Sequence, residues 1–362
     1  MKIALVGGYG HGEILTGPER VARELYGELK NKNHQVVFLE YFFSGYEGAS
    51  LFKKLFGKEY SYNNSIIKLG IIPLLLFLTI NKFDIIHIVN SQRFILFPLL
   101  LRFLYSGKIL TTFHGFMKYE LPEKNYWLKR YFADEWIEKL LVNKSSLLIF
   151  PSSLLSNTFK QYYKVSDDRC IIIPNGISKI FCEKGRVFPE INNSLKIIFY
   201  NGSNDSINRN LDKILEMISN LECEIELYVI GNKIGIKPQR KVKIHFVDLM
   251  SHTELINFLM DKLFIIKSTC YDTFSIMVTE CMALGLIPII SENIGIKDVI
   301  EHGRNGFIYK SSKEDDLAQL LNQISKRKFN LTMISENAKK TVMQLSWEKI
   351  TEQYISAYKS VL

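Results

Sequence analysis

Short apolar runs alternate with longer helical segments along the whole chain. In the first half these runs are apolar on both faces and occupy residues 1–8, 34–40, 83–89, 108–114 and 146–152. Strands of a parallel sheet that is covered on both sides have this pattern. After the first run, Thr16 and Glu19 fit a capping box and Pro18 fits a first turn, which predicts a helix over 16–32.

The alternation restarts after residues 173–178, where Pro174 and Gly176 predict a turn. Further strands are expected at 195–203, 224–231, 242–248, 263–268 and 287–291, with helices near 209–220 and 346–361. The sequence therefore predicts an α/β protein with two doubly wound domains, residues 1–174 and 175–345. Such sheets bind ligands at the carboxyl ends of their strands, so two facing domains would form a deep cleft.

Two strongly apolar runs, residues 66–80 and 94–105, are each too short to span a bilayer and contain proline and a basic residue. We expect them to be buried helices or strands of the core. The N-terminus opens directly on a predicted strand with no visible signal peptide, which favours a cytoplasmic location.

Positive charge is concentrated in the first half of the chain. The net charge is +9, of which residues 1–180 contribute +8, from 23 Lys and Arg against 15 Asp and Glu. Either an anionic partner or a need for solubility explains this excess. The basic residues form no stripe and no nucleic-acid-binding motif is present, which argues against nucleic acid. The five cysteines are scattered without a CxxC pair, so neither a structural zinc site nor a disulfide framework is expected.

Three positions after predicted strands could contact a ligand. The loop at residues 7–17 is rich in glycine but matches neither the dinucleotide fingerprint nor the Walker A loop, so a tight turn and a phosphate contact both remain open. His114 ends a strand and could serve a site or lie in the core. Arg209 begins a helix, where a guanidinium opposes the helix dipole unless an anion lies between them; a solvated arginine is the alternative.

The stretch YDTFSIMVTECMALG, residues 271–285, places two carboxylates around a predicted helix start. The amides of the first turn could bind a phosphate. Glu280 would lie roughly 6 Å further along the axis, where the ribose hydroxyls of a nucleotide would be. Asp272 would meet the group beyond the phosphate. The alternative is an N-terminal aspartate with a buried glutamate bonded to backbone.

These motifs together resemble the retaining family-4 glycosyltransferases of the GT-B fold, and the resemblance runs almost end to end. It rests on the Asp272–Glu280 spacing and on matches at residues 17–36, 173–178, 296–309 and 345–358. It implies two Rossmann-like domains facing each other across a deep cleft. Residues 1–174 would form the acceptor side, with the last helix, about 346–362, packing back on it, and 175–345 the nucleotide-sugar donor side.

The resemblance implies catalytic roles for His114, Asp272 and Glu280. Glu280 would bind the donor ribose, and the transferred sugar would meet Asp272, Thr273 and Phe274. The diphosphate would be bound by Gly17, Arg209, Ser275, Ile276 and Met277. Family members usually carry an Arg…Lys pair for the diphosphate, whereas here Ser203 and Arg209 take those positions. A second base, such as Lys267 or Arg304, could then assist.

The implied reaction moves a sugar from a nucleotide-diphosphate-sugar to a glycan or lipid-linked acceptor with retained configuration. It needs no cofactor and no divalent metal, and no DxD motif stands at a strand end. A role in bacterial surface polysaccharide or glycoconjugate synthesis fits. A sugar-nucleotide epimerase of the same fold and a non-catalytic binder of nucleotide-sugars or glycans are the alternatives.

Residues 125–144 mix aromatic and basic side chains on one predicted helix. Such a helix suits an anionic membrane surface, and the proposed docking residues are Trp127, Lys129, Arg130 and Trp136. The protein would then be peripheral on the inner face of the cytoplasmic membrane. The alternative is an ordinary helix that packs on its own domain through its aromatic residues.

Overall fold

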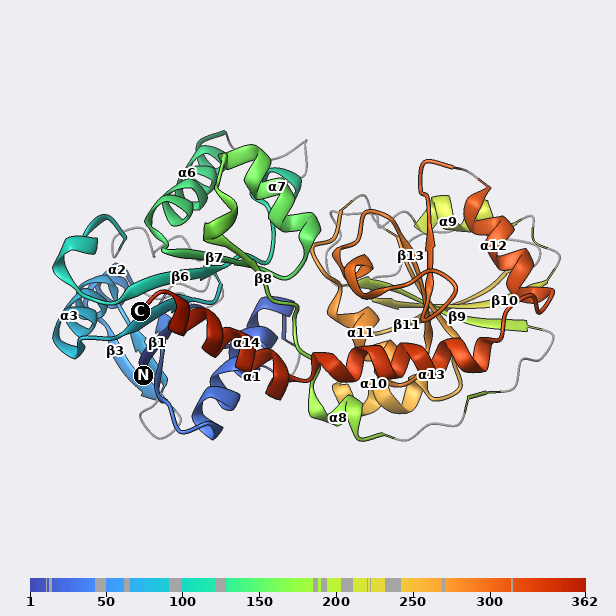
Figure 1. Cartoon of the computed structure of the whole chain (residues 1–362), viewed down its shortest axis with the longest axis horizontal. Helices are drawn as coiled ribbons and strands as arrows, with labels where there is room; N and C mark the ends of the chain where they lie inside the picture. The colour runs from blue at the N-terminus through green and yellow to red at the C-terminus, as the bar shows by residue number, and fades with distance from the viewer. Residues whose placement is uncertain are drawn as a thin grey trace. The chain divides into compact units, whose positions relative to one another are not determined.

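The computed structural model describes residues 1–10, 12, 15–42, 50–61, 66–90, 99–120, 128–184, 188–189, 194–202, 211–219, 221, 223–231, 242–268, 271–313 and 315–362. The chain forms two compact units (Figure 1). The first contains Met1–Gly176 and Trp347–Leu362, and the second contains Ile177–Ser346.

Within the described residues, the first unit contains an eight-stranded sheet in the order β3-β4-β2-β1-β5-β6-β7-β8. The strands pair in parallel, except that β3 is antiparallel to β4. They are β1 (Lys2–Val6), β2 (Gln35–Tyr41), β3 (Lys58–Ser61), β4 (Ile66–Leu69), β5 (Ile85–Ile88), β6 (Lys108–Thr112), β7 (Leu147–Phe150) and β8 (Cys170–Ile172).

The connections of this sheet cover both of its faces. They are α1 (Gly17–Asn31), α2 (Leu51–Phe56), α3 (Ile71–Asn81), η2 (Arg102–Leu104), α5 (Met117–Glu120), α6 (Leu128–Lys144), α7 (Ser153–Tyr163) and η3 (Asp167–Arg169). The chain moves from β1 to β2 and on to β3 and β4, and only after β4 does it return to the other side of β1, at β5. Because parallel crossovers are right-handed, α1 lies on one face, and the connections carrying α3, η2, α6 and α7 lie on the other.

The last helix, α14 (Trp347–Ser360), packs beside α1 in the first unit (Figure 1). It is tied to the sheet through His87 of β5, whose Nδ1 is 2.8 Å from the Tyr358 hydroxyl and whose Nε2 is 2.7 Å from Thr112 Oγ1. Its start lies tightly against Gly176, where a Cβ atom would stand 2.4 Å from the Trp347 ring. Any larger residue at position 176 would displace that ring.

The second unit contains a six-stranded parallel sheet in the order β11-β10-β9-β12-β13-β14, counted over the described part of the chain. Its strands are β9 (Ser194–Gly202), β10 (Glu224–Gly231), β11 (Val242–Val247), β12 (Phe264–Lys267), β13 (Ile287–Ser291) and β14 (Phe307–Tyr309). Its helices are α8 (Lys179–Cys182), α9 (Leu211–Ser219), α10 (His252–Leu259), α11 (Ile276–Ala283), η4 (Gly295–Val299), α12 (Asp316–Ser325), α13 (Leu331–Val342) and η5 (Met343–Leu345).

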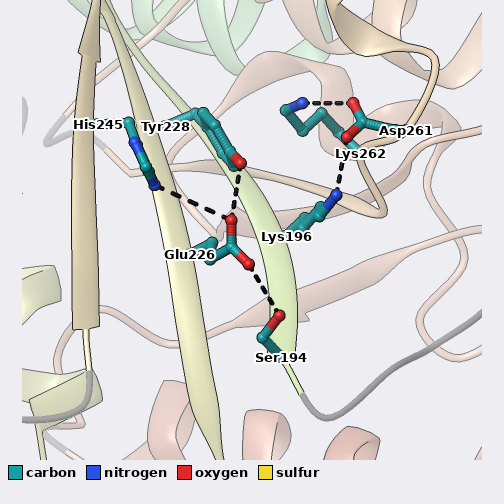
Figure 2. A network of polar contacts seen from close by, with 7 residues as sticks. All are labelled: Ser194, Lys196, Glu226, Tyr228, His245, Asp261 and Lys262. Carbon is teal, nitrogen blue, oxygen red and sulfur yellow. Dashed lines mark hydrogen bonds and ion pairs between the residues drawn. The ribbon is translucent and has the colours of Figure 1, made fainter.

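A polar network joins β9, β10 and β11, the three strands on one side of this second sheet (Figure 2). Glu226 accepts hydrogen bonds from the Tyr228 hydroxyl (2.8 Å) and from Ser194 Oγ (3.0 Å). The His245 ring stacks on Tyr228 with centroids 4.7 Å apart. Lys196 pairs with Asp261 just after α10, at 2.8 Å. These bonds hold the register of β9 and β10, so we assign the network a structural role.

Most of the predicted elements are confirmed. The helix expected over 16–32 is α1, and Glu19 Oε2 accepts hydrogen bonds from the Thr16 amide (2.9 Å) and hydroxyl (2.8 Å). Each predicted strand overlaps an observed one. The prediction that residues 66–80 are buried is wrong for one face of α3, because Leu76 and Ile80 are exposed. In the run 94–105, Leu100, Phe103 and Leu104 are exposed as well, whereas 94–98 lie outside the described residues.

Candidate functional site

The segment from Asp272 to Ser275, directly ahead of α11, is held in a defined shape. The Asp272 amide donates to the Asn293 carbonyl (3.2 Å), and the Asp272 carbonyl accepts from the Gly295 amide (2.8 Å). Ser275, directly before α11, has a left-handed backbone with φ of +75°. Non-glycine residues rarely adopt this conformation, which is common at ligand-binding turns. It leads into the first turn of α11, whose amides have no acceptor within the helix.

Asp272 is oriented by two donors. Its Oδ1 accepts from the Phe274 amide at 3.1 Å, and its Oδ2 is 3.1 Å from Nζ of Lys267, the last residue of β12. Lys267 is only 2 % exposed, whereas the Asp272 side chain is partly exposed. A buried ammonium is costly unless it is paired, so the ion pair holds both groups in place. The carboxylate therefore has a fixed direction ahead of α11.

Glu280 lies one helical turn into α11 and is 2 % exposed. Its Oε1 is 3.9 Å from Nε2 of His252, the first residue of α10. The neighbouring α11 residues from Met277 to Ala283 are all buried. Thr273 is partly buried and Phe274 is fully buried, so Phe274 supports the turn from beneath. The predicted donor residues from Asp272 to Glu280 thus belong to one rigid loop and helix.

A second group of polar residues lies at the carboxyl ends of four neighbouring strands of the first unit, β2, β1, β5 and β6. Asn90, just after β5, accepts from the Gly8 amide (2.6 Å) and donates to the Gly8 carbonyl (3.0 Å). Glu40 Oε1 accepts from the Tyr9 amide at 3.0 Å. Two buried side chains thus fix the first part of the glycine-rich loop. Gly17 begins α1 at the far end of this loop.

His114 follows β6, and its Nε2 is 2.8 Å from the Val89 carbonyl. Because a carbonyl only accepts, Nε2 carries the proton and Nδ1 holds the lone pair in the neutral ring. Burial lowers the pKa of His114 to about 4. The ring is therefore neutral near pH 7 and can act there as a hydrogen-bonding group, but not as a strong acid.

Several predicted site residues lie outside the described residues, namely Arg209, Ser203 and Trp127, as do the side chains of Lys129 and Arg130 on α6. Arg304 is exposed and pairs with Glu301 at 2.6 Å. Trp136 on α6 is 49 % exposed. The same helix also packs on its own unit through Ile137 and Leu141, so packing on the domain accounts for part of the pattern read at 125–144.

Sequence reasoning missed three residues of these two groups, Asn90, Glu40 and His252. Asn90 follows an apolar strand directly, and that position was a usable signal. Glu40 and His252 carry no such signal, because their partners are distant in the chain. Lys267 was named only as an auxiliary base, and its pairing with Asp272 is a finding of the structure. In the described part of the chain, no group of three or more His, Cys, Asp or Glu is arranged to hold a metal ion.

Two family models match the chain. The one described as Glycosyltransferase Family 4 matches residues 15–179, and the one described as Glycosyl transferases group 1 matches residues 184–341. A curated relative, the N-acetyl-alpha-D-glucosaminyl L-malate synthase of Bacillus anthracis, is 26 % identical over 151 residues. That match covers 41 % of this chain and only 34 % of the relative.

Solved structures resemble the whole chain. A sucrose-phosphate synthase from Thermosynechococcus elongatus has a TM-score of 0.75 at 14 % identity, covering 99 % of this chain and 98 % of that one. The lipopolysaccharide outer core galactosyltransferase WaaB, in its apo form, has a TM-score of 0.75 at 14 % identity over 100 % of both chains. HepE from Anabaena, solved with UDP and glucose, has a TM-score of 0.70 at 13 % identity, covering 99 % of this chain and 100 % of that one. At these identities the likeness concerns the fold, which is GT-B.

Proposed function

Since this chain belongs to the family-4 glycosyltransferases of the GT-B fold, we propose that it transfers a sugar from a nucleotide-diphosphate-sugar to a glycan or lipid-linked acceptor. The transfer retains the configuration of the anomeric carbon. Its place is the synthesis of bacterial surface polysaccharide or glycoconjugates. The protein works in the cytoplasm, peripheral on the inner face of the cytoplasmic membrane.

One observation carries the proposal: Asp272 is fixed by Lys267 and the Phe274 amide, just ahead of a helix start that is followed by the buried Glu280. A ligand that spans this helix start would carry hydroxyls at both ends and an anion between them. A nucleotide-sugar has that order of groups: ribose, diphosphate and sugar.

In the proposed binding mode, Glu280 accepts hydrogen bonds from the ribose hydroxyls. The amides of the first turn of α11, at Ile276 and Met277, donate to the diphosphate. Asp272 accepts from hydroxyls of the transferred sugar, because a carboxylate oxygen can accept more than one hydrogen bond. Uridine diphosphate is the first nucleotide to test, since HepE was solved with UDP and with UDP-glucose.

As the bond between the anomeric carbon and the diphosphate breaks, negative charge grows on the leaving diphosphate. The helix amides and Arg209 stabilise this charge electrostatically. We propose that no divalent metal is needed, with Lys267 adding positive charge nearby. His114, neutral at working pH, contacts the sugar as a hydrogen-bonding group, and the Val89 carbonyl holds its orientation.

Calorimetric titration with UDP, GDP, ADP and UDP-glucose tests the donor site. We expect one nucleotide diphosphate to bind wild-type protein and to raise its melting temperature, because a ligand at a hundredfold its Kd adds about 2.7 kcal/mol. Mass spectrometry of the products with and without acceptor then tests transfer, and NMR distinguishes an epimerised nucleotide-sugar, whose mass is unchanged. Binding of none of these ligands contradicts the donor assignment, and release of an epimerised nucleotide-sugar contradicts the transferase.

A further inference from the structure

The first unit exposes an unusual amount of apolar surface. Of the fifteen large apolar side chains that are exposed among the described residues, nine lie within residues 52–104. We call these nine the exposed apolar surface: Phe52, Phe56, Tyr60, Ile72, Leu76, Ile80, Leu100, Phe103 and Leu104. Single exposed apolar residues are normal, whereas a concentration on adjoining elements indicates a binding surface.

Helix α3 forms the centre of this surface. Its buried side is made by Leu74 and Leu78, yet Ile72, Leu76 and Ile80, spaced four residues apart, form an apolar stripe on the outer side. Ile80 is 74 % exposed. The one hydroxyl near the stripe, Thr79, donates to the Leu75 carbonyl at 2.8 Å. A helix that is apolar all round is normally surrounded by apolar groups on all sides.

The other members adjoin this helix. Helix α2 contacts α3. It carries Phe52 and Phe56, whose ring centroids lie 5.2 Å apart. The connection with η2 is the next crossover on the same face of the sheet as α3. An open hollow of about 440 Å³ is lined both by Lys82, just after α3, and by Arg102 of η2. Phe103, beside Arg102, is 79 % exposed.

The surroundings of this surface are strongly basic. Residues 51–110 contain eight Lys and Arg but only two acidic residues, Glu59 and Asp84. Lys82, Arg102 and Lys108 line the hollow together with Asp84 and Leu362. Lys53 and Lys54 lie on α2 between the two phenylalanines. Apolar side chains flanked by bases match a lipid surface with acidic head groups.

We propose that the exposed apolar surface inserts into an anionic membrane, with the surrounding bases contacting lipid phosphates. This proposal deepens the proposed function, because it assigns the membrane contact to α2, α3 and η2. It rests on the proposed function in one respect, namely that the acceptor is linked to a lipid. A second copy of the chain fits the surface less well, because it would bring two basic regions together. The contact that we propose is a shallow insertion of side chains. No helix among the described residues is long and apolar enough to cross a bilayer.

The test is flotation of the full chain with vesicles of equal parts phosphatidylcholine and phosphatidylglycerol, and with vesicles of phosphatidylcholine alone. We expect binding to the anionic vesicles that weakens as salt is added. The double variant Leu76→Ser/Ile80→Ser should lower the partition coefficient by about tenfold or more, since it removes two inserted side chains. Lys53→Gln/Lys54→Gln should weaken binding to the anionic vesicles only.

Met333→Ser is the matched control, because Met333 is 51 % exposed on α13 of the second unit. It should leave partitioning unchanged. Equal losses in this control and in Leu76→Ser/Ile80→Ser overturn the proposal, as does absence of wild-type binding to both vesicle types. A dimer in light scattering that Leu76→Ser/Ile80→Ser converts to monomer assigns the surface to a second copy and also overturns it. Nucleotide titration of the same preparations separates failure here from failure of the donor site.

Discussion

The Lys267 ammonium lies 3.1 Å from the Asp272 carboxylate, and it joins the end of β12 to the turn that precedes α11. Lys267 is buried, whereas Asp272 is partly exposed. One group is thus held in the protein while its partner can reach a ligand. This pair makes Lys267 a positioning residue for a carboxylate that we assign to the transferred sugar.

Lys267→Met should therefore lower both stability and turnover. The substitution removes a charged hydrogen-bond donor of the partly exposed Asp272 carboxylate, at a cost of about 1.5–3 kcal/mol. Chemical denaturation measures the stability, and donor hydrolysis or transfer measures kcat and KM. Lys262→Met is the matched control, because Lys262 is also buried and pairs with Asp261 in the network of Figure 2.

The control should lose stability but keep the kcat of the remaining folded protein. In Lys267→Met/Asp272→Asn, stability should partly return while turnover stays low, because no carboxylate remains to contact the sugar. If Lys267→Met keeps its wild-type kcat and donor KM, the positioning role is wrong.

Glu280→Gln should weaken nucleotide binding by about tenfold or more, because hydrogen bonds to a charged group contribute about 1.5–3 kcal/mol. The two side chains have the same size, so the fold should persist. Glu138→Gln serves as the control, since Glu138 is a buried carboxylate in the first unit that accepts from the Tyr163 hydroxyl at 2.6 Å. Unchanged affinity of Glu280→Gln for the free nucleoside diphosphate would rule out the ribose contact.

Arg209→Ala should reduce turnover strongly, and Arg209→Lys should restore part of it. Both predictions rest on the sequence alone, since Arg209 and Ser203 lie outside the described residues. At close range in a partly desolvated site, one cation contributes on the order of a few kcal/mol to the binding of an anion. Lysine keeps the positive charge but lacks the planar guanidinium that can donate two parallel hydrogen bonds. Ser203→Arg should raise donor affinity. Steady-state kinetics at saturating acceptor compares the variants, and near-wild-type values for Arg209→Ala would mean that the diphosphate is held elsewhere.

Activity should survive EDTA, because helix amides and basic side chains, rather than a metal, are proposed to stabilise the leaving diphosphate. The measurement is product formation in dialysed enzyme with and without chelator. Loss of turnover that magnesium or manganese restores would overturn the metal-independent mechanism.

The free energy of unfolding should fall as pH drops below about 6.5, the ordinary pKa of histidine. Burial lowers the pKa of His87 to about 3 and that of His114 to about 4. Below pH 6.5 these histidines are protonated in the unfolded chain but remain neutral in the folded chain. Their contribution to the free energy of unfolding is therefore complete above pH 6.5, and it declines as the pH falls toward the folded-state pKa values. Each histidine contributes a slope of about 1.4 kcal/mol per pH unit.

His87→Gln should remove about half of that slope, as measured by denaturation at several pH values. His302→Gln, at an exposed histidine of the second unit, is the control. A pH dependence that is identical in wild type and in His87→Gln would contradict the assignment to His87.

The sequence by itself determined the α/β class, the two tandem sheets and most strand positions, because alternation of apolar runs with helices depends on neighbours in the chain. It also determined the turn and helix that carry Asp272 and Glu280, since helix starts and short spacings are local properties.

Contacts between distant residues were decided only by the tertiary structure. Lys267 and Asp272 meet because a strand end and a turn are fixed by the Asn293 and Gly295 backbone. The Asn90 side chain accepts a hydrogen bond from the Gly8 amide because β1 and β5 are neighbours in the sheet. The exposed side of α3 was likewise hidden from the sequence: an apolar helix has the same composition whether its outer face meets protein, lipid or water, and only the packing around it shows which side is covered.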